Sequence, residues 1–175
     1  MSSAPADIVV RRARTADVRA IRGFVDAYAP GRKLLNKPTV TLYEDVQEFW
    51  VAERAGGQAP GAVVGCGALH VMWEDLAEVR TLAVDPELRG IGIGHLLLNQ
   101  LVRSARELGV RRLFCLTFEV DFFAAHGFSE LDGSPVAPEV FEELLRSYDE
   151  GIAEFLDLER VKPNTLGNTR MIMHL

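Results

Sequence analysis

The most constraining feature of the sequence is a glycine-rich segment between a short apolar run and a longer apolar stretch. The run Leu82–Val84 is typical of a buried strand, and Asp85-Pro86 ends it. Three glycines at alternate positions then precede an apolar helical stretch: Gly90, Gly92 and Gly94. A glycine-rich turn at a helix start lets backbone N–H groups approach a ligand closely, and the helix dipole adds positive potential there. The segment therefore predicts a site for phosphate or pyrophosphate.

The overall composition limits the kinds of partner. The chain has 175 residues, 48% of them apolar, and a formal net charge of −6. This suits one domain over residues 1–175, with 1–7 as a flexible tail. Nucleic-acid binders are usually basic, so we expect no nucleic-acid partner. No stretch resembles a signal peptide or a membrane span, so we expect a cytoplasmic protein with no membrane partner.

The cysteines and histidines do not form a recognisable metal site. Cys66 and Cys115 each lie inside an apolar run, far apart in sequence, which favours buried free thiols over a disulfide. His70 and His126 lie in or beside apolar runs without a partner at metal-ligand spacing. We expect partly buried, hydrogen-bonded histidines and no metal.

Hydrophobic spacing and turn residues predict mixed strands and helices in one domain. The expected strands cover 8–12, 49–53, 62–73, 76–84, 111–117, 128–131 and 168–175. The expected helices cover 17–28 with Thr15 as its cap, 41–48 capped by Thr41, the stretch from the glycines to Gly109, 120–126, and 138–155. The helix after the glycines presents one apolar face: Leu97, Leu101, Val102, Ala105 and Leu108.

Other glycine-rich turns fit less well. A Walker loop requires Lys-Ser/Thr after the last glycine, where this chain has His95-Leu96. A dinucleotide fingerprint requires G-x-G-x-x-G, whereas Gly90, Gly92 and Gly94 are evenly spaced. A tight structural turn without a ligand is the remaining alternative.

The segment Arg89–Gly94 matches the Q/R-x-x-G-x-G/A signature and resembles the GNAT superfamily of acetyl-CoA-dependent N-acetyltransferases. Leu82–Pro86 and Phe123–Phe128 are similar to that family as well. The resemblance implies a mixed α/β (α+β) GNAT fold. Its central sheet would have about seven strands, mostly antiparallel, with splayed strands and flanking helices.

Further segments narrow the resemblance: Glu78–Val84, Leu116-Thr117, Lys33–Leu35, Thr41–Tyr43 and Phe49–Ala52. Together they look like the short, stand-alone actinobacterial form of the N-acetylglutamate synthases. This implies an amino-acid N-acetyltransferase that acetylates the α-amine of L-glutamate or L-glutamine, at the first step of arginine biosynthesis.

The resemblance assigns cofactor contacts to the strand end and the glycine loop. Backbone groups of Leu82 and Val84 would pair with the pantetheine arm of acetyl-CoA, and an N–H near Leu82 or Ala83 would stabilise the oxyanion. The pyrophosphate would be held by Arg89 and by the main chain of Gly90, Ile91, Gly92, Ile93, Gly94 and His95. Side chains at Gly92 and Gly94 would block that approach.

Acyl transfer to an amine also requires a proton acceptor, because only the neutral amine attacks. Strand period two places residues 78, 80, 82 and 84 on one face, which makes Glu78 the candidate base. The alternative is a solvated carboxylate at a strand end.

The carboxylate of an amino-acid substrate requires a cation. Arg80 is the first candidate, as a bidentate fork, followed by Lys33 and by Arg170 in the last strand. The alternative for Arg80 is a surface arginine, and for Lys33 a solvated lysine.

One position departs from the family pattern. A tyrosine that often protonates the leaving thiolate is replaced by Phe123, four residues before Gly127. Water could serve instead, since a thiol with a pKa of ~8.5 is a fair leaving group. Tyr28 and Tyr43 are candidate substitutes.

Two other functions stay open. One is a GNAT enzyme acting on a protein N-terminus, a lysine or another small amine, which the acidic 138–155 stretch permits. The other is a non-catalytic acyl-CoA-binding module, supported by Phe123. The sequence does not decide between glutamate and glutamine, and it leaves a homodimer open.

Overall fold

One mixed sheet organises the chain. The computed structural model describes residues 7–29, 37–162 and 167–175. Within these residues, seven strands pair in the order β1-β2-β3-β4-β5-β7-β6. The strands are β1 Ile8–Arg12, β2 Phe49–Arg54, β3 Val63–Trp73, β4 Leu76–Val84, β5 Arg112–Thr117, β6 Ser129–Glu130 and β7 Thr169–His174. Neighbours are antiparallel except β4 and β5, which are parallel. This confirms the predicted mixed, mostly antiparallel sheet.

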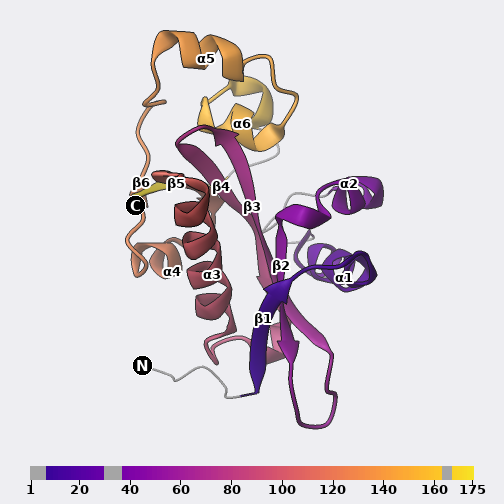
Figure 1. The fold of residues 1–175 in the computed structure, drawn as a ribbon. Coiled ribbons are helices and arrows are strands. Elements are labelled where there is room, and N and C mark those ends of the chain that lie inside the picture. The colour runs from indigo at the N-terminus through magenta and orange to yellow at the C-terminus, as the bar shows by residue number, and fades with distance from the viewer. Residues whose placement is uncertain (1–6, 30–36, 163–166) are drawn as a thin grey trace.

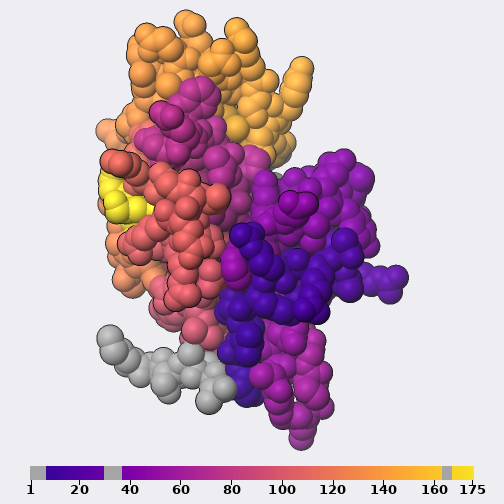
Figure 2. Space-filling view, viewed as in Figure 1, coloured from indigo at the N-terminus to yellow at the C-terminus, as the bar shows by residue number. Residues whose placement is uncertain are grey.

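Helices cover both faces of the sheet (Figure 1). They are α1 Val18–Tyr28, α2 Thr39–Glu44, α3 Ile93–Leu108, α4 Val120–Ala124, α5 Pro138–Leu144 and α6 Glu150–Phe155. Helices α3 and α4 lie on one face, whereas α1 and α2 lie on the other (Figure 1). Helices α5 and α6 cover one end of the molecule, seen in orange in Figure 2. Among the described residues, no helix combines the length and apolar character needed to cross a bilayer.

The core divides along the two faces. Leu98, Leu101 and Ala105 of α3 pack on Leu69 and Val79 of the sheet. On the opposite face, Ile21 and Val25 of α1 pack on Phe49, Cys66 and Ala68. Both cysteines are free and buried, as predicted. Burying apolar side chains on two faces of one sheet explains the long apolar runs in its central strands.

The predicted helix over 138–155 is wrong in one respect, because the chain forms two helices there. Helix α5 ends at Leu144, and α6 starts after Asp149, whose carboxylate accepts the N–H of Ile152 at 3.0 Å. An aspartate at this position competes with helix continuation and favours a new N-terminus. The break places Asp149 beside the sheet.

Two predicted caps and one core position are also wrong. Thr15 lies inside a 3-10 turn, where the carboxylate of Asp17 accepts the N–H of Arg14 at 2.7 Å. Thr41 lies inside α2, which begins two residues earlier at Thr39 after Pro38. Leu108 is 61% exposed at the end of α3, where Gly109 ends the helix as predicted. Ala105 in the same turn is buried, so Leu108 lies on the side of the turn that faces solvent.

We expect substitution of Gly65 in β3 to destabilise the fold. A Cβ there would lie 3.0 Å from the Ala83 carbonyl oxygen and from a methyl of Leu97. Gly65→Val should therefore lower the free energy of unfolding by about 1–3 kcal/mol, measured by urea denaturation. Gly56→Ala is the control, since nothing lies within 4 Å of a Cβ at Gly56. Equal stability of the two variants would contradict this packing.

Candidate functional site

The site begins where β4 and β5 separate. Their parallel pairing runs from Leu76↔Arg112 to Glu78↔Phe114, and no further pair joins them along the described strands. Beyond this point lies a cavity of about 940 Å³, lined by β4, the start of α3, α4, and the segments around α2 and α6. The separation confirms the predicted splayed strands, and the volume is that of a cofactor-sized site.

At one end of the cavity, the start of α3 forms a cradle of backbone amides. Gly92 caps the helix with φ 95°, and a Cβ on Gly90, at φ 83°, would meet nothing within 4 Å. The first intrahelical bond is Leu96 N–H to the Gly92 carbonyl at 3.2 Å, so the amides before it are available to a ligand. An open cradle at the N-terminus of a 16-residue helix fits a diphosphate.

The predicted cofactor residues gather around this cradle. All of them line the cavity except Ile91, which is absent from its lining and 38% exposed. Arg89 lies at the mouth, 2.9 Å from a carboxylate oxygen of Glu119. His95 Nδ1 lies 2.8 Å from His126 Nε2, and His126 Nδ1 donates to the Phe122 carbonyl. Burial and the neighbouring His126 lower the pKa of His95.

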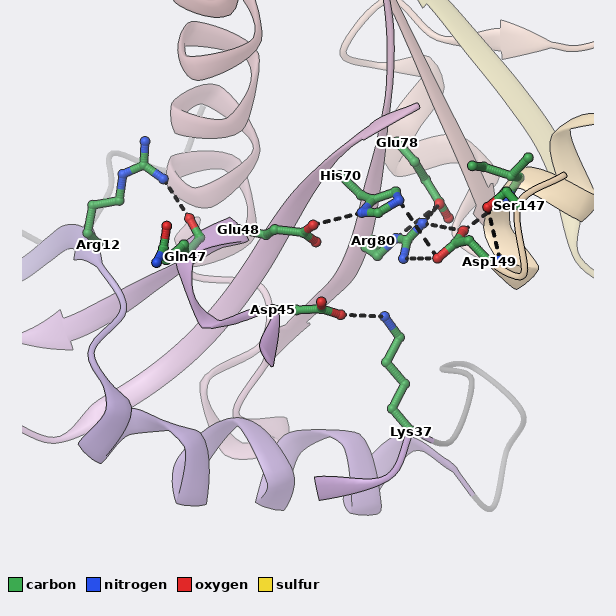
Figure 3. A network of polar contacts seen from close by, with 11 residues as sticks. Arg12, Lys37, Asp45, Gln47, Glu48, His70, Glu78, Arg80, Ser147 and Asp149 are labelled. Carbon is green, nitrogen blue, oxygen red and sulfur yellow. Dashed lines mark hydrogen bonds and ion pairs between the residues drawn. The ribbon is translucent and has the colours of Figure 1, made fainter. Parts of the chain in front are cut away.

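At the other end, two carboxylates share one guanidinium (Figure 3). Arg80 donates to Glu78 Oε2 from Nε at 3.0 Å and from Nη2 at 2.5 Å. It also donates to both oxygens of Asp149, at 2.9 and 2.8 Å. The side chains of Glu78 and Arg80 are each only 8% exposed. A buried cluster of this kind is costly unless its charged groups are hydrogen-bonded, and here both carboxylates accept hydrogen bonds from Arg80.

The pKa values of the two carboxyl groups that share Arg80 are shifted in opposite directions. Burial raises the pKa of Glu78, and the charge of Arg80 only partly opposes this. Burial also raises the pKa of Asp149, but hydrogen bonds and charge from Arg80 outweigh it and lower that pKa to about 2. Burial would lower the pKa of Arg80, yet the two carboxylates raise it overall. Of the two carboxyl groups, Glu78 is thus the one whose protonated form the surroundings favour, and Asp149 is the one they hold as an anion.

The predicted role of Arg80 as a free carboxylate fork does not fit this geometry. Its guanidinium already donates four hydrogen bonds to Glu78 and Asp149. Five N–H groups are available in total, so a bidentate bond to a substrate is not open while both protein carboxylates remain bound.

Arg170 does not fit its predicted role as a substrate-binding cation either. It donates to the carbonyls of Glu154 and Phe155 at 2.8 and 2.5 Å, and to that of Gly133 at 2.8 Å. It is not part of the cavity lining. Arg170 thus satisfies carbonyls at the C-terminal end of α6, which explains why a cation in β7 is buried there. The other predicted cation, Lys33, lies outside the described residues.

The prediction that residues 78, 80, 82 and 84 share one face of β4 is wrong, because β4 contains a bulge. Cys66 pairs with Ala83 and Ala68 with Arg80, so Thr81 and Leu82 together oppose one residue of β3. Thr81 has φ 55°, in the left-handed region. An extra residue reverses the alternation beyond it.

The side chains after the bulge accordingly change sides. A Cβ on Gly67 would touch both Leu82 and Leu101 of α3 at 3.0 Å, and Val84 packs with Leu97 of α3. Leu82 and Val84 therefore face α3, whereas Glu78 and Arg80 face Gly151 of α6 on the opposite side. Leu82, Ala83 and Val84 still line the cavity.

Lys37 is a cavity residue that the sequence did not single out. Its side chain is only 18% exposed, and its Nζ lies 4.0 Å from Asp45 Oδ2 (Figure 3). Burial, and next the charge of Arg80, lowers the pKa of Lys37. Lys37 follows the predicted Lys33 by four residues in the sequence, but only the fold shows that Lys37 lines the cavity.

Tyr28, Tyr43 and Phe123, the aromatic residues considered for protonating the leaving thiolate, lie in different surroundings. Tyr28 lines the cavity and donates its hydroxyl to the Val84 carbonyl at 2.5 Å, while burial raises its pKa. Tyr43 is 45% exposed and is not part of the lining. Phe123 is buried against Phe128, with ring centroids 5.2 Å apart. Tyr28 is thus the candidate substitute that reaches the strand end.

His70 is partly buried and partnered, as predicted. Its Nδ1 lies 2.7 Å from Glu48 Oε1, and its Nε2 lies 3.8 Å from Asp149 Oδ2. Within the described part of the chain, no group of three His, Cys, Asp or Glu side chains is placed to hold a metal ion.

Comparison with known proteins identifies the family. The model of the acetyltransferase (GNAT) family matches residues 21–131. The chain belongs to the GNAT family. An amino-acid acetyltransferase of Mycobacterium tuberculosis is 59% identical to this GNAT protein over the full length of both chains. An amino-acid acetyltransferase of Aeromonas salmonicida is 31% identical over 69% of this chain and 27% of its own.

Solved structures agree with this assignment. The crystal structure of Rv2747 from Mycobacterium tuberculosis in complex with CoA and NLQ has a TM-score of 0.90 and 61% identity to this GNAT protein. The match covers 95% of this chain and 99% of that one. N-acetylglutamate synthase from Neisseria gonorrhoeae, complexed with coenzyme A and N-acetyl-glutamate, has a TM-score of 0.76. The match covers 99% of this chain and 36% of that one, and at 22% identity it shows the shared fold.

Proposed function

We propose that this GNAT enzyme is an amino-acid N-acetyltransferase. It transfers the acetyl group of acetyl-CoA to the α-amine of glutamate or glutamine, at the entry to arginine biosynthesis. The observation that carries the proposal is that one cavity joins an amide cradle at α3 to the buried pair Glu78–Arg80. The full-length similarity to an amino-acid acetyltransferase supports the choice of substrate class. Cytoplasmic location and a homodimer stay predictions.

Residues of the cradle and strand end position the cosubstrate. The amides from Gly92 to His95 and the Arg89 guanidinium fit the diphosphate of acetyl-CoA. The register leaves Thr81 and Leu82 without partners on β3. In this proposal, backbone N–H groups at this bulge stabilise the negative oxygen that develops during acyl transfer.

Glu78 acts as the base in this proposal. An α-amino group with an ordinary pKa of ~8 is mostly protonated near neutral pH, so its proton must be removed before attack. Glu78 accepts that proton, directly or through water. Its burial raises its pKa and so strengthens it as an acceptor relative to an exposed carboxylate.

Lys37 binds the substrate carboxylate in this proposal. Its ion pair with Asp45 is long, at 4.0 Å, whereas Arg80 is held closely by two carboxylates and Arg89 lies 2.9 Å from Glu119. Binding an anion beside Lys37 would also offset the cost of burying its charge. The remaining prediction, Lys33, is in the segment that precedes Lys37.

Among free amines, we expect glutamate or glutamine to be acetylated most efficiently. Thiol release from acetyl-CoA should be followed for a panel of amino acids, two peptides with free N-termini, and the simple amine butylamine. Binding of acetyl-CoA should be measured in parallel by calorimetry. Binding without turnover of any amine would favour the non-catalytic module, and preferred turnover of the peptides would contradict the amino-acid assignment.

Glu78→Gln should lower kcat at least about 100-fold, because it removes the proton acceptor while preserving side-chain size. In the native enzyme the acid limb of kcat/KM should lie above the ordinary glutamate pKa of ~4.3, since the folded pKa of Glu78 is raised. Activity of the native enzyme should be lost as pH falls through the raised pKa of Glu78, and this acid limb should be absent in the variant. Glu142→Gln, at an exposed site on α5, is the control. Retention of the limb in Glu78→Gln would refute the assignment.

Lys37→Met should raise the KM for the amino acid about 10-fold or more, because a charge-assisted hydrogen bond contributes about 1.5–3 kcal/mol. The KM for acetyl-CoA should stay within about twofold, since the cradle lies at the other end of the cavity. Arg146→Met is the control, because the exposed Arg146 pairs with Glu143 and is not part of the cavity lining. An unchanged amino-acid KM would remove Lys37 from the substrate site.

A further inference from the structure

Asp149 connects the start of α6 to the buried pair Glu78–Arg80. Its Oδ1 accepts the N–H of Ile152 at 3.0 Å and an Arg80 N–H at 2.8 Å. Its Oδ2 accepts a second Arg80 N–H at 2.9 Å. One carboxylate therefore caps the helix and binds the guanidinium at both oxygens, although 69 residues separate Asp149 from Arg80. Such a bidentate pair fixes orientation as well as distance.

The first turn of α6 also rests directly on Glu78. A Cβ on Gly151 would lie 2.0 Å from Glu78 Oε2 and 2.8 Å from Arg80 Nη2. Glycine is thus the residue whose backbone can cover this carboxylate without displacing it. The cap at Asp149 holds that backbone in place and keeps water from one side of the cluster.

We propose that Asp149 is a positioning residue: by holding Arg80 between two carboxylates, it limits how strongly the guanidinium stabilises the charged form of Glu78. The inference rests on the proposed role of Glu78 as the base. Asp149 itself touches neither reacting group in this scheme.

The electrostatic reason is that one positive charge cannot fully compensate two negative ones. Arg80 donates hydrogen bonds to both oxygens of Asp149, and the negative charge of Asp149 raises the pKa of Glu78. Without that charge, Glu78 would be the sole carboxylate on Arg80. Its ionised form would be favoured and its basicity would fall.

Other groups around the cluster act on it from each neighbouring element. Arg80 belongs to β4, as does Glu78 itself. The remaining groups are His70 of β3 with its partner Glu48, Lys37 and Asp45 around α2, Glu154 of α6, and Cys115 of β5. None of these groups is substituted in a variant at Asp149, so the charge that the substitution removes is that of Asp149 alone.

The test is Asp149→Asn, because asparagine is as good an N-cap as aspartate and nearly the same size. The ionisation of Glu78 should be followed by carbon NMR of the side-chain carboxyl groups, with Glu78→Gln identifying the signal. We expect the Glu78 pKa to fall by about one unit in Asp149→Asn. In turnover, the acid limb of kcat/KM should move to lower pH by a similar amount. The kcat should fall about tenfold and the amino-acid KM should change less than about threefold.

Asp157→Asn is the matched control, since Asp157 pairs with Lys162 away from Glu78 and should leave the Glu78 pKa unchanged. An unchanged or raised Glu78 pKa in folded Asp149→Asn would overturn the proposal and leave Asp149 as a helix cap only. The NMR titration does not require turnover. A native protein inactive on every amine would therefore refute the proposed function while the effect of Asp149 on Glu78 is still measured.

Discussion

The separation of β4 from β5 after Glu78 is the constraint on which the rest of this structure depends. Two adjacent strands normally satisfy each other's backbone groups, and parting them leaves those groups to find other partners. At the strand end, the Tyr28 hydroxyl donates to the Val84 carbonyl. The bulge at Thr81 turns the side chains of Leu82 and Val84 toward α3, while both residues still line the opened space.

The two ends of the cavity differ in electrostatic character. At α3, the ligand would meet main-chain dipoles, which require no counter-ion and suit a diphosphate. Beside α6, it would meet a compact set of full charges in which Glu78, Arg80 and Asp149 are mutually paired. In the proposed function, a zwitterionic amino acid would occupy the second environment, with Lys37 binding its carboxylate and Glu78 accepting the proton of its amine.

Phe123 bears on the choice between an enzyme and a binding module. It packs on Phe128 as part of the core, so the usual general acid is replaced by an apolar side chain. Proton donation to the leaving group is the lesser requirement, since a thiolate leaves readily. The buried pair Glu78–Arg80 is harder to explain in a protein that only binds acyl-CoA, because burying these charges costs free energy and no reaction would use them.

The sequence by itself predicted the glycine-rich turn at the start of α3 and the order of the elements. Glycine spacing and the strand-to-helix change are local properties, which is why β4, α3 and the Gly109 stop were predicted from nearby residues. The tertiary structure alone decided the faces of β4 and the partners of Arg80. A bulge residue reverses strand alternation without a clear sequence signal, and Asp149 meets Arg80 across 69 residues of chain. Long-range ion pairs and bulges depend on how distant elements pack, and local periodicity does not contain that information.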